Sequence, residues 1–357
     1  MLYVNYRDTI FKLPCTEVLQ MKFFKKIFCF LLSFTLLFGT CNYAMAACND
    51  SSSTSPEVTH YNYPIVPGTA EWTKLTTHQA MIDAVQIPQD ILDKMTTDEL
   101  ATAVLDNPMI IDIYAYYTLE DGFNKGYDVL CQELNCVREL SKRSNAMSCL
   151  TTELNNINST VTLQKSPEIS EELESKYLVG NRILQCITKE NSSSIDAIAD
   201  PQTPKISVLA STTTVSTPKG SSVSVYSNMT WADHGLTANE VTSLSNAYIK
   251  AYPNASKIAN QSPVYNCHNY AWNTSNPQKY WMNNPSKYMS DGSYSKTATA
   301  ASGYKVYYPN GGHSATIISN TDDNIYVKSK WGVLPVFKHN VHYSPYEDSG
   351  ITFWRKN

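Results

Sequence analysis

Two short segments near the C-terminus carry residue types that could together perform nucleophilic chemistry. Cys267 follows Tyr265 and Asn266, and it shares a helical face with Ala271, which predicts a helix that begins at the cysteine. Unpaired backbone N–H groups at a helix start stabilise a thiolate. His313 follows two glycines and opens an alternating segment, which predicts a strand. A thiol and an imidazole placed in this way would act as nucleophile and general base.

A third segment, residues 324–332, alternates like the neighbouring strand of a hairpin. It places Ser329 sixteen residues after His313, and this serine is the candidate for orienting the imidazole, as the third member of a triad does. Asn324 or a backbone carbonyl is the alternative for this third position. Trp331 adjoins Ser329 and is expected to line the cleft, because aromatic faces pack against sugars and peptides.

The order of these segments resembles the papain-like bacterial cell-wall hydrolases, in particular the cysteine, histidine-dependent amidohydrolase/peptidase (CHAP) group and its NlpC-type relatives. The resemblance covers residues 217–357 and implies a papain-like α+β fold with an antiparallel sheet. It also implies that Cys267 is the nucleophile and His313 the general base. Ser329 departs from the pattern, since CHAP-type enzymes usually carry glutamate or asparagine at the third position.

The function that follows is cysteine-dependent hydrolysis of an amide bond in peptidoglycan stem peptides or in another extracellular peptide. The backbone N–H of Cys267 would hold the oxyanion together with the side chain of Asn266 or Tyr265. His268 points about 100° away from Cys267 on a helix, which favours a supporting role. No cofactor is expected. Two alternatives stay open, namely a metal site of Cys267, His268 and His313 and a non-catalytic module that binds cell wall or a partner through the same fold.

The N-terminal region has the pattern of an export signal. Residues 1–20 form an extension, and residues 21–46 contain lysines, an apolar stretch and the small-residue site Ala44-Met45-Ala46, as a signal peptide does. We therefore expect a secreted bacterial protein with no transmembrane helix in the mature chain. The same region also fits a lipoprotein box, in which Cys48 would be lipidated and would anchor the protein at the outer face of the membrane.

Charge divides the rest of the chain into two parts. Residues 60–190 carry 19 acidic and 10 basic side chains, whereas residues 217–357 carry 7 acidic and 12 basic ones. The Ser/Thr-rich stretch 191–216 between them predicts a linker. The predicted organisation is thus a tether at 47–69, an α-helical domain at 70–190 and the α+β domain at 217–357. The overall formal charge of −4 gives no indication of a nucleic-acid partner.

The helical region should contain about five or six short amphipathic helices, with capping patterns such as Thr96 followed by Glu99. It suggests no site of its own, so its expected role is to bind a protein partner. Its single histidine, His78, is expected at the surface or at a helix end. An even set of cysteines in an oxidising compartment predicts two disulfides. These cysteines are Cys131, Cys136, Cys149 and Cys186.

Overall fold

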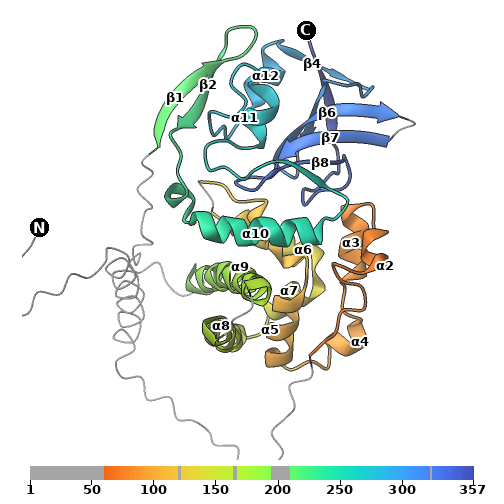
Figure 1. Ribbon diagram of the computed structural model, residues 1–357, viewed down its shortest axis with the longest axis vertical. Coiled ribbons are helices and arrows are strands. Elements are labelled where there is room, and N and C mark those ends of the chain that lie inside the picture. The colour runs from red at the N-terminus through yellow and green to blue at the C-terminus, as the bar shows by residue number, and fades with distance from the viewer. Residues whose placement is uncertain (1–59, 120–121, 164–166, 194–209, 322–323) are drawn as a thin grey trace, which may run out of the picture. The chain divides into compact units, whose positions relative to one another are not determined.

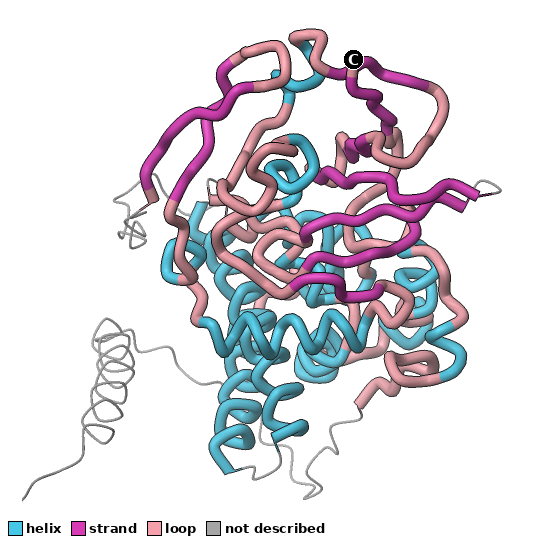
Figure 2. Tube along the Cα trace, turned by 45° about the horizontal axis from the view of Figure 1, so that its top comes forward, coloured by secondary structure: helices cyan, strands magenta, loops and turns pink. Residues whose placement is uncertain are grey.

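Helices occupy the first part of the described chain and antiparallel strands most of the second part, so the fold is α+β (Figures 1 and 2). The computed structural model describes residues 60–119, 122–163, 167–193, 210–321 and 324–357. The predicted signal peptide, Cys48 and most of the predicted linker lie outside these residues. The predicted helix at Cys267 and the strand at His313 lie within them.

The helices before the linker are mostly short, and the last two are the longest. They are α2 (Ala70–Thr73), α3 (His78–Ala84), α4 (Gln89–Leu92), α5 (Thr97–Asp106), the 3₁₀ helix η1 (Ile110–Tyr114), α6 (Asn124–Glu133), α7 (Asn135–Leu140), α8 (Ala146–Leu163) and α9 (Pro167–Ser193). The predicted capping box opens α5, where the side chain of Thr96 accepts the N–H of Glu99 and the Glu99 carboxylate accepts that of Thr96. More helices form than predicted, because single turns such as α2 and α4 are too short to show periodicity.

The second part begins with a small ribbon and a long helix. Strand β1 (Ser211–Ser216) pairs antiparallel with β2 (Ser222–Ser227), and the 3₁₀ helix η2 (Ala232–His234) follows. Helix α10 (Ala238–Ala251) begins at the capping box formed by Thr237 and Glu240. In Figure 1 this helix crosses between helices α5, α7, α8 and α9 on one side and the larger sheet on the other.

The larger sheet has 7 strands in the order β3-β8-β7-β6-β5-β9-β4, and every neighbouring pair is antiparallel. The strands are β3 (Ser256–Ala259), β4 (Tyr294–Thr297), β5 (Lys305–Tyr308), β6 (His313–Thr321), β7 (Asn324–Lys330), β8 (Val336–Asn340) and β9 (Thr352–Lys356). Strands β6 and β7 form the predicted hairpin, in which Thr316 lies opposite Lys328. The sheet therefore brings the segment of His313 next to that of Ser329.

Two short helices accompany this sheet. Helix α11 (Cys267–Trp272) contacts β6 and β7, and α12 (Ser286–Ser290) contacts β4. The hydroxyl of Ser314 ties α11 to the start of β6, because it bonds both His268 Nδ1 and Trp272 Nε1 at 2.8 Å. This contact holds the beginning of α11 close to the beginning of β6.

The helical part and the sheet part share one hydrophobic core. Buried side chains of α5 and η1 belong to the same cluster as those of α10, β6 and β8. Trp72 Nε1 donates to the carbonyl of Ala251 at 2.7 Å, and Tyr248 Oη donates to that of Ile111 at 2.7 Å. The described residues all belong to one compact unit. The two regions that the sequence divides by charge thus meet over buried side chains.

The described cysteines form no disulfide, so the prediction of two bridges in the helical part is wrong. Cys131, Cys136, Cys149, Cys186 and Cys267 are all unbridged. The sulfur of Cys136 lies 3.8 Å from Tyr63 Oη and 3.6 Å from Asn107 Nδ2, inside the core. The helical core takes up such thiols as small apolar side chains, a role that cysteine fills without a bridge.

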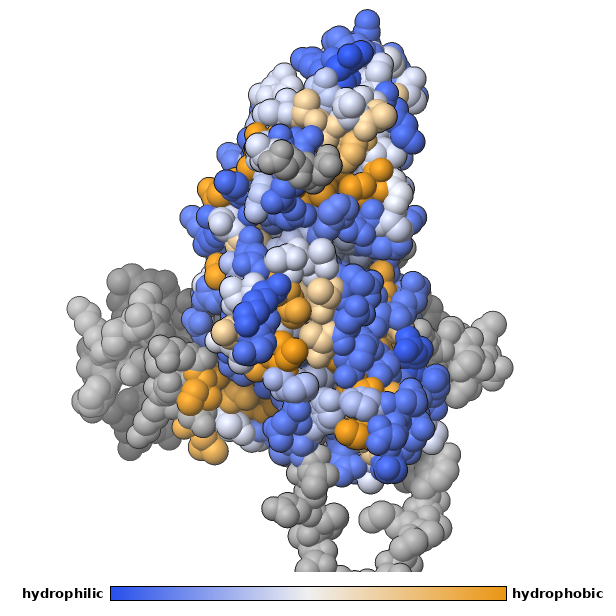
Figure 3. Space-filling model, turned by 90° about the vertical axis from the view of Figure 1, so that its right-hand side faces the viewer, coloured by the Kyte–Doolittle hydropathy of each residue, from blue (hydrophilic) through white to orange (hydrophobic). Residues whose placement is uncertain are grey.

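The outer surface is mainly polar. Figure 3 shows that hydrophobic residues on one face of the molecule occur in small groups among hydrophilic ones. The exposed large hydrophobic side chains of the described chain are Ile91, Met147, Leu163, Ile169, Ile249 and Ile258. Scattered apolar residues of this kind are ordinary on a protein surface. Within the described ranges, no helix combines the length and the hydrophobicity that crossing a membrane requires.

Candidate functional site

Cys267 is the first residue of helix α11, as the sequence predicts. Asn266 precedes it in an extended conformation and caps the helix, because its side-chain oxygen accepts the N–H of Asn269 at 3.2 Å. The same oxygen accepts the N–H of Met282, and the Asn266 amide nitrogen donates to the carbonyl of Met282 at 2.8 Å. These bonds hold the residue before the cysteine rigidly in place.

The thiol of Cys267 is protonated at neutral pH in this arrangement. Burial raises its pKa to about 11, although the backbone N–H groups of Ser314 and His268 and the charge of Lys330 act in the opposite direction. Cys267 is 7% exposed and lines a cavity. Its thiol is a weak nucleophile until its proton is removed.

The cavity beside Cys267 has a volume of about 490 Å³, and residues from both parts of the chain line it. The sheet part supplies Asn266, Cys267, His268, Trp281, Asn283, Asn284, Pro285, Tyr307, Gly311, Gly312, Gly332 and Tyr346, and the helical part supplies Ala115, Tyr116, Tyr117, Thr118 and Lys125. This size suits a ligand as large as a short peptide. The wall supplied by the helical part was not predicted, because the sequence pattern of α6 and η1 is that of ordinary amphipathic helices.

Lys125 brings a positive charge to this cavity from helix α6. Its Nζ donates to the carbonyl of Asn310 at 3.0 Å and lies 5.5 Å from the ring centre of Tyr116. Burial and, to a smaller extent, the charge of Lys125 lower the pKa of His268 to about 4. The imidazole of His268 is therefore neutral at pH 7, with Nδ1 bonded to Ser314 Oγ at 2.8 Å.

His313 is the first residue of β6, as predicted, but its imidazole makes no hydrogen bond to Cys267. Both ring nitrogens are buried and lack a hydrogen-bond partner among the described residues. Burial lowers the pKa of His313 well below its usual range, and the neighbouring His339 and His268 lower it further. The backbone N–H of the next residue, Ser314, does reach the thiol of Cys267. The two residues are thus neighbours whose side chains are not joined.

Tyr346 contacts the imidazole of His313 and also lines the cavity. The two rings lie parallel, with centres 3.6 Å apart and an angle of 9° between their planes. Tyr346 comes from the loop between β8 and β9, and its hydroxyl has no hydrogen-bond partner among the described residues. The sequence offered no signal for it, because one tyrosine among 24 stands out only through its position in space.

Ser329 lies in the core rather than beside His313. Its Oγ bonds His339 Nε2 at 2.8 Å and accepts the indole N–H of Trp331 at 3.0 Å. Ser329 therefore orients His339, a residue that the sequence analysis did not single out. Asn324, the alternative third member, lies at the opposite end of β7, where its Oδ1 accepts from the Asn340 amide at 2.6 Å.

Trp331 does not line the cavity, which corrects the expectation from the sequence. Its side chain is fully buried and packs against Phe337 and Tyr252, with ring centres 4.3 Å and 5.0 Å away. It belongs to the core that the sheet shares with the helical part. The adjacent Gly332 is the residue that reaches the cavity wall.

Neither side chain predicted to bind the oxyanion, Asn266 or Tyr265, is available for that role. The Asn266 amide is bonded to Met282, as described above. Tyr265 is buried outside the cavity wall, where its ring lies 5.2 Å from Lys330 Nζ. That lysine is itself buried and donates to the carbonyls of Ser262, Gly332 and Leu334.

Within the described chain, no group of three or more His, Cys, Asp or Glu side chains is placed to hold a metal ion. Cys267, His268 and His313 therefore do not form a metal site.

A buried polar cluster joins the two parts of the chain at another place. His78 opens helix α3, in agreement with the expected helix end, but it is buried rather than at the surface, and its Nε2 lies 3.1 Å from Asp112 Oδ2. Tyr252 Oη donates to the same oxygen at 2.6 Å. Burial acts to lower the pKa of His78, but the hydrogen bond and charge of Asp112 outweigh it and raise this pKa. The cluster links α3, η1 and the residue after α10.

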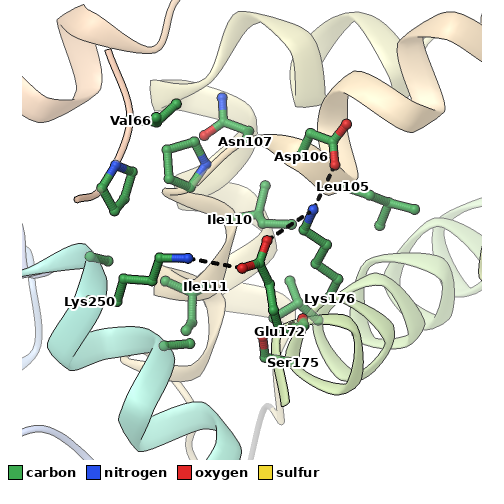
Figure 4. A pocket seen from close by; sticks show the side chains of 15 residues that line it. Val66, Leu105, Asp106, Asn107, Ile110, Ile111, Glu172, Ser175, Lys176 and Lys250 are labelled. Atoms are coloured by element: carbon green, nitrogen blue, oxygen red, sulfur yellow. Dashed lines mark hydrogen bonds and ion pairs between the residues drawn. The ribbon is translucent and has the colours of Figure 1, made fainter. Parts of the chain in front are cut away.

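Figure 4 shows a second cavity, with a volume of about 280 Å³, where η1, α9 and α10 meet. Ion pairs cross its rim, since Glu172 lies 2.9 Å from Lys250 and 3.6 Å from Lys176, which in turn lies 2.8 Å from Asp106. Its floor is apolar and includes Ile110. No cysteine or histidine of the described chain lines this cavity, so the thiol chemistry belongs to the larger one.

Comparisons of this chain with protein-family models, with curated proteins and with solved structures find no match.

Proposed function

We propose that the protein is a cysteine-dependent amide hydrolase that cleaves peptidoglycan stem peptides or another extracellular peptide. The observation that carries this proposal is the position of Cys267 at the start of a helix, in the wall of a cavity of about 490 Å³ that also contains an imidazole, His268. Cleavage of an amide needs a thiol, a group that moves its proton and room for the peptide. The part from residue 217 onward would have the papain-like α+β architecture.

His313 is the proton acceptor in this mechanism. A buried imidazole with two unpartnered nitrogens is costly to a folded protein, and a partner that arrives with the substrate would compensate for it. Tyr346 lies against one face of the ring and holds the imidazole in this orientation. Binding of a peptide would bring the Cys267 proton within reach, as catalytic hydrogen bonds often tighten only in the complex.

Export and cell-wall location complete the proposal. The mature chain would be released after cleavage of residues 21–46, or it would be anchored through a lipid on Cys48. The helical part contributes a wall of the cavity, including Lys125, and would bring the enzyme to a protein partner. The expected substrate, a polymer or peptide outside the cell, fits this location.

The test is digestion of purified peptidoglycan and of unstructured peptides by the full chain, followed by mass analysis of the fragments. Cleavage that is lost in C267A and kept in C131A supports the proposal, because Cys131 is a half-buried thiol outside the cavity. A complete absence of new amine ends across wall types and peptides would contradict it.

The second candidate is a binding module without catalysis, in which the cavity holds a wall peptide or a partner. Two observations favour it, namely the pKa of about 11 for Cys267 and the absence of a hydrogen bond between this thiol and His313. For this function, C267A would sediment with insoluble peptidoglycan as well as the native chain does, and no bond would be cut.

A further inference from the structure

We infer that the hydroxyl of Tyr346 donates a hydrogen bond to the oxyanion that forms when Cys267 attacks a carbonyl. This inference rests on the proposed hydrolase function and assigns a further catalytic residue to the same cavity. Tyr346 lines the cavity with Cys267, is 3% exposed, and has a hydroxyl without a hydrogen-bond partner among the described residues. A buried hydroxyl without a partner is unfavourable unless a ligand provides one.

The ring of Tyr346 is held in one orientation by its neighbours. The imidazole of His313 lies flat against it. The ring of Tyr116, which also lines the cavity, has its centre 5.6 Å from that of Tyr346. Tyr116 Oη accepts the backbone N–H of Glu347 at 2.9 Å, which fixes the residue that follows Tyr346. A donor that is held before the substrate arrives stabilises developing charge without reorganisation.

The hydroxyl is a donor over the whole neutral range of pH. Burial raises the pKa of Tyr346 well above its usual value, and the negative charge of a Cys267 thiolate raises it further. The backbone N–H of Gly332 approaches the same oxygen and lowers this pKa, without reaching hydrogen-bond geometry.

The donors predicted from the sequence do not compete with Tyr346. Asn266 uses its amide nitrogen for Met282, and Tyr265 does not line the cavity. Tyr307 does line the cavity, but its ring lies 6.3 Å from that of His268 rather than against His313. Tyr326 is a matched control, because it is a half-buried tyrosine of β7 outside the cavity wall.

The reaction proceeds through acylation of Cys267 and hydrolysis of the resulting thioester. The thiol proton moves to His313, the sulfur forms a bond to the carbonyl carbon, and the π pair moves to oxygen, which accepts from Tyr346 Oη and the Cys267 N–H. The C–N bond then breaks, and the amine leaves with the proton from His313. Water adds to the thioester and gives a proton to His313; the C–S bond breaks, and that proton returns to sulfur.

The experiment measures how tightly a peptide aldehyde, N-acetyl-phenylalanyl-glycinal, forms a hemithioacetal with Cys267 in the full chain. An isotope label on the aldehyde carbon allows carbon NMR to count the adduct. We expect Y346F to weaken adduct formation by about tenfold to a hundredfold, as loss of an oxyanion donor does. We expect Y326F to stay within about twofold of the native chain, and C267A to form no adduct.

The outcomes separate this inference from the proposed function. Equal adduct formation by Y346F and the native chain would overturn the role of Tyr346 and leave a thiol hydrolase in place. No adduct in the native chain, with Cys267 still open to alkylation, would overturn both. On a cleaved substrate, Y346F should lower kcat and leave KM nearly unchanged, whereas a loss confined to KM would show that Tyr346 only shapes the cavity.

Discussion

The imidazole of His313 and the phenol ring of Tyr346 lie parallel at 3.6 Å, and neither the two imidazole nitrogens nor the phenol oxygen has a hydrogen-bond partner within the described chain. Unsatisfied buried polar groups are rare in proteins, and three in one stacked pair form an unusual cluster. Tyr346 and Cys267 both line the larger cavity, which relates this cluster to the thiol.

Alkylation of Cys267 should be slow at neutral pH and should accelerate steadily as the pH rises. The thiol has a pKa of about 11, so only a minute fraction is thiolate at pH 7. We expect iodoacetamide to react at least about a hundredfold more slowly than with an unperturbed cysteine thiol, whose pKa is about 8.5. Peptide mapping by mass spectrometry gives the rate at Cys267. A rate that levels off below about pH 8 would contradict the described arrangement.

Ser329 should act on stability rather than on catalysis. In S329A, the indole N–H of Trp331 and His339 Nε2 lose their short hydrogen bonds inside the core. We expect a loss of about 1–3 kcal/mol in the free energy of unfolding, measured with urea. The rate of peptide cleavage per folded molecule should match that of the native chain. A well-folded S329A without activity would restore this serine as the third catalytic residue.

Acid should destabilise the fold over the range in which histidines of the unfolded chain gain protons. Burial lowers the pKa of His234, His268 and His339 to about 4 in the folded state. Histidines of the unfolded chain have a pKa of about 6.5, so between about pH 4 and 6.5 the unfolded chain binds more protons than the folded one. Stability should fall as the pH drops from about 6.5, and the contribution of these three histidines, up to about 3 kcal/mol each, should be lost by about pH 4. Urea unfolding at several pH values measures the slope, and a flat profile would contradict these pKa values.

Asp112 should be essential for joining the helical part to the sheet part. D112A removes the partner of both His78 and Tyr252 within the core and should cost about 3–5 kcal/mol of unfolding free energy. D112N should cost less, since an amide oxygen can still accept from Tyr252. The matched control is D83A, because Asp83 is exposed and its bond is to the exposed Gln79. Thermal unfolding followed by circular dichroism compares the variants, and similar curves for D112A and D83A would contradict the role of the cluster.

The local elements of the site could be predicted from the sequence, because their signals lie within a few residues of each element. The helix at Cys267, the strand at His313, the hairpin with residues 324–330 and the capping box of α5 all form as predicted. Periodicity and capping reflect interactions between near neighbours in the chain, which tertiary packing leaves unchanged here.

Only the tertiary structure decides which side chains meet. Ser329 and Trp331 lie on the expected strand or next to it, yet the core shared with the helical part buries both of them. The cavity wall that includes Lys125 and the ring that covers His313 come from segments far from Cys267 in the chain. Such contacts depend on how whole elements pack, and the alternation of polar and apolar residues within one strand carries no information about which other element will cover it.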